Sequence, residues 1–144
     1  MKTNMRTMKK YALLLIVALV SFSCSIDDDE NVNYRFEFVA TDTVEFPSEI
    51  YVNNTYNVTI YYTLPNSCYY INGIDYNYTD DYERTVALVA TVYDGTNCDA
   101  NTVLESTTFD FKPINAGTYT FNFLTGQDDN GDYTYSTYDV VVLE

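Results

Sequence analysis

Apolar and polar residues alternate in short runs from residue 33 onward, and turn-forming residues separate the runs. The clearest run is 56–64, where Val58, Ile60, Tyr62 and Leu64 fall on one face because successive side chains of a strand point to opposite sides. From residue 32 onward, no stretch has a convincing helical period. The pattern predicts strands at 33–40, 44–46, 56–64, 68–74, 83–93, 103–111, 118–124 and 133–143.

Strands of this length and spacing predict an all-β fold, an antiparallel sandwich of about seven to eight strands over residues 32–144. The run 83–93 is apolar on both faces and should be a central strand. The run 33–40 places Tyr34, Phe36 and Phe38 opposite Arg35, Glu37 and Val39, which is typical of a half-buried strand. We expect loops between residues 74 and 82 and at residues 126–131.

The first 23 residues have a different character. Residues 1–10 are basic and residues 11–20 are apolar. An apolar segment of this length is shorter than the roughly 20 residues that span a bilayer as a helix. Together with the small residues Ser21 and Ser23 it predicts a cleaved signal peptide, residues 1–23. Cys24 would then begin the mature protein, followed by an acidic tether over residues 24–31.

Residues Ser21-Phe22-Ser23-Cys24 and the acidic run 27–30 together resemble the start of surface lipoproteins of Bacteroidota. The resemblance implies lipidation of Cys24, with a diacylglycerol on the thiol and acylation, such as palmitate, on the new amine. It also implies export to the cell surface on the outer membrane. Read from its residues alone, the acidic run is a solvated tether, which leaves surface or periplasmic facing open.

The predicted domain resembles small immunoglobulin-like β-sandwich domains in one local motif. Gly117-Thr118-Tyr119 matches the tyrosine corner of these domains, where the phenol bonds to an upstream backbone carbonyl. This resemblance implies an architecture and no activity.

Acidic residues dominate the chain, with 21 against 7 basic residues and a formal charge of −14. After Cys24 only three bases remain against all 21 acids, so the formal charge of the mature part is −18. Such a field repels phosphates, and we expect no nucleic-acid partner. Cys68 and Cys98 are an even pair in an exported domain and predict a disulfide, with two buried free thiols as the alternative.

Few residues of the chain are suited to catalysis. With no histidine, nucleophilic sites of the usual kind and histidine-based metal sites are excluded, and we expect no enzymatic activity and no cofactor. Calcium is the metal that the sequence leaves open, because oxygen-bearing side chains recur in two stretches. These are Asp128, Asp129, Asn130 and Asp132, and Asp75, Asn77, Thr79, Asp81 and Glu83. The same residue types also form ordinary turns.

Tyrosines gather in two regions and suggest contact with a ligand, because a tyrosine has a flat apolar face and a polar tip. One group is Tyr69, Tyr70, Tyr76, Tyr78 and Tyr82, and the other is Tyr133, Tyr135 and Tyr138. Tyrosine also favours strands, so about half of each group should face the core. We expect a non-enzymatic binding or accessory module at the outer membrane. The alternatives are a carbohydrate-binding lipoprotein of a nutrient-uptake system and a structural surface coat.

Overall fold

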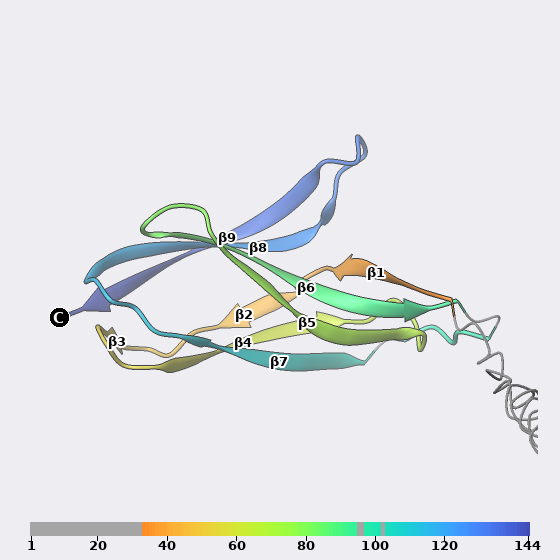
Figure 1. Cartoon of the computed structure of the whole chain (residues 1–144), viewed down its shortest axis with the longest axis horizontal. Coiled ribbons are helices and arrows are strands. Elements are labelled where there is room, and N and C mark those ends of the chain that lie inside the picture. The colour runs from red at the N-terminus through yellow and green to blue at the C-terminus, as the bar shows by residue number, and fades with distance from the viewer. Residues whose placement is uncertain (1–32, 95–96, 102) are drawn as a thin grey trace, which may run out of the picture. The chain divides into compact units, whose positions relative to one another are not determined.

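The structure is a computed structural model that describes residues 33–94, 97–101 and 103–144, which belong to one compact unit. These residues form nine strands, and Figure 1 shows them in two layers. The strands are β1 (Tyr34–Val39), β2 (Thr43–Glu45), β3 (Ile50–Tyr51), β4 (Tyr56–Thr63), β5 (Tyr69–Tyr78), β6 (Glu83–Tyr93), β7 (Leu104–Phe111), β8 (Gly117–Gln127) and β9 (Tyr133–Leu143).

Strand β6 is the centre of a six-stranded sheet. Strand β5 pairs with nearly its whole length on one side, while β1 and β8 share the other side, β1 along residues 88–93 and β8 along residues 83–86. Strand β9 then pairs with β8, and β3 with β9. The second sheet has the order β2-β4-β7. The prediction that residues 83–93 are a central strand is therefore confirmed.

The β-sandwich is confirmed, but several details of the prediction were wrong. Among the described residues there are nine strands, because the pattern could not reveal the two-residue β3. The sheets are not purely antiparallel, since β6 pairs with β8, and β3 with β9, in parallel. Strand β5 continues to Tyr78 through the expected loop, and β8 reaches Gln127. Each extension lies beyond a register shift in the strand pairing. The shift changes the face on which the following side chains lie, so the alternation of apolar and polar residues is interrupted there.

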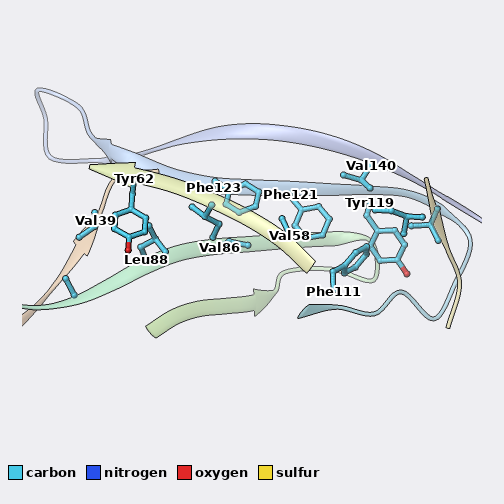
Figure 2. Close-up of a cluster of buried hydrophobic side chains, with 14 of the residues drawn as sticks. Val39, Val58, Tyr62, Val86, Leu88, Phe111, Tyr119, Phe121, Phe123 and Val140 are labelled. Carbon is cyan, nitrogen blue, oxygen red and sulfur yellow. The ribbon is translucent and has the colours of Figure 1, made fainter. Parts of the chain in front are cut away.

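The core lies between the two sheets (Figure 2). Val58, Ile60, Tyr62 and Leu64 of the β4 region are all buried, as their alternation predicts. They face Val86 and Leu88 of β6 and an aromatic group that includes Phe111, Phe121 and Phe123. The ring of Phe121 lies 5.0 Å from that of Phe111 and 5.1 Å from that of Phe46, between centroids. Phe121 is therefore enclosed by other rings.

Tyr119 opens β8 beside this aromatic group. Its hydroxyl donates a hydrogen bond to the backbone oxygen of Asn115 at 3.2 Å. This is the upstream bond that the Gly117-Thr118-Tyr119 motif predicts. Gly117 has a φ of +140°, a conformation that L side chains rarely adopt.

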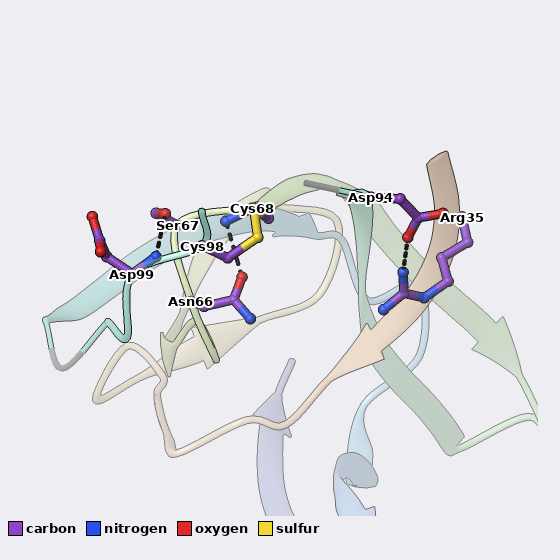
Figure 3. Close-up of a disulfide and its surroundings, with 7 residues drawn as sticks. All are labelled: Arg35, Asn66, Ser67, Cys68, Asp94, Cys98 and Asp99. Carbon is purple, nitrogen blue, oxygen red and sulfur yellow. Dashed lines mark hydrogen bonds and ion pairs between the residues drawn. A yellow bond between two sulfur atoms is a disulfide. The ribbon is translucent and has the colours of Figure 1, made fainter. Parts of the chain in front are cut away.

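A disulfide links Cys68 and Cys98, the pair that the sequence predicts, with their Cα atoms 5.4 Å apart (Figure 3). Hydrogen bonds hold the backbone on both sides of it. The amide of Cys68 donates to the Asn66 side chain at 3.0 Å, and the amide of Asp99 donates to the Ser67 hydroxyl at 3.0 Å. The bridge therefore fixes the segment before β5 to the segment before β7.

Truncation of the enclosed ring should be strongly destabilising. Phe121→Ala removes a fully buried ring and should lower the free energy of unfolding by about 3–5 kcal/mol. The control Phe36→Ala removes a ring that is 59% exposed and should cost less than about 1 kcal/mol. Urea unfolding followed by tyrosine fluorescence measures both. Equal losses in the two variants would contradict this assignment of buried and exposed rings.

Loss of the disulfide should also be measurable. Cys68→Ala combined with Cys98→Ala opens a loop of 30 residues and should lower the free energy of unfolding by about 3–4 kcal/mol. A reducing agent should shift the urea midpoint of the native chain and leave that of the double variant unchanged. A native midpoint that ignores the reducing agent would contradict the bridge.

Candidate functional site

A cleft of about 730 Å³ lies on the face of the six-stranded sheet that is turned away from the second sheet. Three parts of the chain line it: β1, the middle of β5 and β6, and the end of the β8–β9 hairpin that carries its loop. In Figure 1 that end of the hairpin rises away from the three-stranded sheet. The lining residues are Phe36, Glu37, Phe38, Asn72, Asp75, Val89, Leu124, Gly126, Gln127 and Tyr133.

Strand β1 supplies an apolar wall of the cleft because Phe36 and Phe38 lie on the face of the strand opposite to the buried Val39. Val39 is the residue of β1 that enters the core. Phe36 and Phe38 point the other way, opposite Thr91 and Val89 of β6, and are 59% and 43% exposed. The expected strand is present, but Val39 is the one buried residue of its six, and its phenylalanines lie on the outward face.

Exposed rings continue beyond the cleft along the same face. We call Tyr34, Phe36, Phe38, Tyr70, Tyr93 and Tyr133 the aromatic strip. Ring centroids are 5.6 Å apart for Tyr70 and Tyr93, and 6.3 Å for Tyr93 and Tyr34. They are 5.6 Å apart for Tyr34 and Phe36, and 5.7 Å for Phe38 and Tyr133. Since Phe36 and Phe38 are next neighbours on one face of β1, the strip is continuous.

Two β-bulges lie on opposite sides of the cleft. The register of β5 shifts between Ile71 and Gly73, and that of β8 shifts between Leu124 and Gly126. Gly126 has a φ of +138°, which favours glycine. Bulges bend a strand and redirect its side chains. Here they bring the amides of Asn72 and Gln127 to the cleft.

Three polar side chains of the cleft are available to a ligand, while the Glu37 carboxylate is already hydrogen-bonded. Within the described part of the chain, Asn72, Asp75 and Gln127 make no side-chain hydrogen bond or ion pair. No lysine or arginine is among the described residues that line the cleft. The cleft thus combines apolar walls, two amides and one unpaired carboxylate, Asp75.

A charged cluster supports β1 on the opposite face of the sheet. Glu37 accepts hydrogen bonds from the hydroxyl of Tyr69 and from the guanidinium of Arg35. The same guanidinium also forms an ion pair with Asp94. The bond from Tyr69, with that from Arg35, lowers the pKa of Glu37, and the same carboxylate raises the pKa of Tyr69. These contacts fix β1 to β5 and to the end of β6, and so hold the phenylalanines in place.

The two stretches considered for calcium form no cluster of metal ligands among the described residues. The Asp128 carboxylate accepts hydrogen bonds from the amides of Asn130 and Asp132, which lowers its pKa. In the other stretch, Asp75 and Asn77 lie on β5, and Asp75 lines the cleft. Within the described ranges, no three acidic or cysteine side chains are grouped so as to hold a metal ion.

The buried guanidinium of Arg84 binds the loop of this second stretch from within. It donates to the backbone oxygens of Asp80 at 2.7 Å, Asp81 at 3.0 Å and Glu83 at 2.8 Å. It also lies 4.3 Å from the centroid of the Tyr78 ring and 5.2 Å from that of Tyr119. The carbonyls of this turn therefore converge on a side-chain cation of the protein itself.

The tyrosine groups divide between core and surface, as expected. Tyr69, Tyr76 and Tyr138 pack against the core, while Tyr70, Tyr133 and Tyr135 are exposed. The sequence missed Phe36, Phe38, Asn72 and Gln127 as site residues. Asp75, which belongs to a stretch for which the sequence left calcium open, lines the cleft. Alternation does not tell which face of a strand is buried, so no signal marked the two phenylalanines.

Cys24, the signal peptide and the tether lie outside the described residues, and their assignment stays a prediction. In the part of the chain that the structure describes, no helix is sufficiently long and apolar to cross a bilayer.

The two packed sheets define an all-β sandwich domain. The sequence model of the ORF11 beta-sandwich domain family matches residues 58–140, more than half of the chain, and the chain belongs to this family. The matched part runs from β4 into β9 and includes every strand of the cleft except β1. No significant match to a curated protein or to a solved structure is found.

Tyr76 makes stability sensitive to alkaline pH. Burial raises its pKa from 10.0 to about 12, so the folded chain keeps this proton at a pH where the unfolded chain releases it. Its contribution to stability is complete below pH 10 and is lost as the pH rises towards 12. Tyr76→Phe should therefore lose less stability than the native chain over this range, measured by urea unfolding at stepped pH. Identical slopes would contradict the role of Tyr76.

Proposed function

We propose that this chain is a non-enzymatic lipoprotein, anchored through Cys24 to the outer membrane at the cell surface, that binds a partner through the cleft of the six-stranded sheet. The observation that carries the proposal is the exposure of Phe36 and Phe38 at the wall of this cleft. A phenylalanine has no polar tip that would favour contact with water. Contiguous exposed apolar surface is typical of interaction sites.

The sequence supports the membrane anchor. The basic segment 1–10, the apolar segment 11–20 and Cys24 form the predicted lipoprotein signal. Each acyl chain stabilises attachment by roughly 0.8 kcal/mol per buried methylene, so two or three chains give a firm anchor. The acidic run 27–30 supports facing the cell exterior, through its resemblance to the Bacteroidota export signal.

An immunoglobulin-like relationship for the sandwich belongs to the same proposal. The hydrogen bond from Tyr119 to Asn115 supports it, because it reproduces the tyrosine corner of such domains. Folds of this kind host many functions, so the relationship adds no ligand.

The second candidate function is carbohydrate binding for a nutrient-uptake system. Asn72, Asp75 and Gln127 favour it, because unpaired amides and a carboxylate beside aromatic rings suit the hydroxyl groups and apolar faces of sugars. The chain has no tryptophan, which weakens this alternative.

Photo-crosslinking on intact cells tests the proposed binding face. The photoreactive residue p-benzoylphenylalanine, placed at Phe36 of the full chain, should form a discrete adduct because Phe36 borders the cleft. The same residue at Thr108, an exposed position of β7 in the other sheet, is the matched control and should form none. Gel shift and mass spectrometry detect the adducts.

Equal adducts at both positions, or none at either, would contradict the binding face. The variant Cys24→Ala tests the anchor in the same cells and should move the chain out of the membrane fraction. Retention of Cys24→Ala in that fraction would mean that a lipid on Cys24 does not hold the protein there.

A further inference from the structure

The orientation of the aromatic rings restricts what the cleft can bind. Neighbouring rings of the aromatic strip are tilted against each other by 57–84°. A flat sugar chain makes its most extensive stacking contact with rings whose faces share one plane. Tilted rings leave spaces between them, which suit separate side chains of a ligand.

The walls of the cleft are suited to apolar side chains. The apolar lining consists of three aromatic residues, Phe36, Phe38 and Tyr133, together with Val89 and the buried Leu124. The volume of about 730 Å³ is within the range of pockets that enclose a ligand the size of a few side chains. An apolar or aromatic side chain placed here would remove its own surface and that of both phenylalanines from water.

The negative charge at and around the cleft favours a basic group on the ligand. Asp75 has no partner, and the lining offers no base to an anionic ligand. The mature part of the chain carries a formal charge of −18, which repels a second copy and attracts a cation. A lysine or arginine beside Asp75 would therefore be favoured by the contact and by the field of the whole domain.

The amides beside the two bulges complete the set of contacts. Asn72 and Gln127 each offer both a donor and an acceptor. A peptide backbone also offers both along its whole length. Two amides on opposite sides of an apolar cleft can therefore hold an extended segment by its main chain.

From these observations we infer that the cleft binds an extended segment of a partner protein, with an apolar or aromatic side chain between Phe36, Phe38 and Tyr133 and a basic side chain at Asp75. The inference rests on the proposed function, whose binding face it uses, and it assigns the class of ligand.

An immobilised library of random nonapeptides, probed with the full chain in detergent, tests the inference. The enriched peptides should combine an aromatic or aliphatic residue with lysine or arginine. Their binding, measured by calorimetry, should weaken as NaCl rises from about 50 mM to about 500 mM, because salt screens the contact with Asp75.

Variants show whether the peptides occupy the cleft. Phe38→Ala and Tyr133→Ala should each weaken binding by about tenfold or more, as expected for central aromatic contacts. Asp75→Asn should reduce the salt dependence. Val141→Ala removes an exposed apolar side chain from β9 outside the cleft and should leave the affinity unchanged. Retained melting temperatures show that the variants are folded.

Three outcomes would overturn the inference: enrichment of acidic peptides, peptide binding that ignores Phe38→Ala, or failure of the library to yield a binder. The full chain is also tested on an array of neutral glycans. Glycan binding that Phe38→Ala abolishes would replace the peptide with a sugar and leave the proposed function in place. No binding to the peptide library or to the glycan array, together with no adduct at Phe36, would contradict both the inference and the proposed function.

Discussion

Strand β6 is apolar on both faces, and the packing of the domain depends on how each face is covered. The three-stranded sheet covers one face, where Val86 and Leu88 meet β4 and the phenylalanines of β7 and β8. The other face carries Ala87 and Val89, and no second layer of the described structure covers it. Phe38 of β1 and Leu124 of β8 shield it from the sides instead. A central strand with two apolar faces in a two-layer fold therefore leaves a partly open apolar surface, and the cleft is that surface.

Two of the three basic residues of the domain, Arg84 and Arg35, hold strands and turns together. Arg84 binds three carbonyls of the turn between β5 and β6, and two aromatic rings lie against it. Arg35 joins Glu37 to Asp94 at the other end of β6. No lysine or arginine of the described residues lines the cleft, and the excess of acidic residues favours cations over anions near it.

Local alternation predicted much of the fold, and what it missed depended on pairing between strands. Val58, Ile60 and Tyr62 were identified as core residues because β4 is regular along its length. The face of β1 that is buried could not be predicted, since Phe36 and Val39 are both apolar and only the register with β6 decides between them. The bulges of β5 and β8 were invisible for the same reason, and with them the positions of Asn72 and Gln127. The candidate site therefore emerged almost entirely from tertiary structure.

The outward face of the six-stranded sheet argues against a purely structural reason for the exposed rings. Aromatic residues favour strands in general, so this preference alone would spread them over the whole face. Instead, the part of that face formed by β8 and β9 below the cleft carries hydrogen-bonded polar pairs, such as Thr120 with Asp139 and Thr137 with Asn122. The rings collect on β1, the neighbouring ends of β5 and β6 and the far end of the hairpin, where the bulges also lie. Segregation of rings and polar pairs on one continuous face is typical of a localised interaction surface.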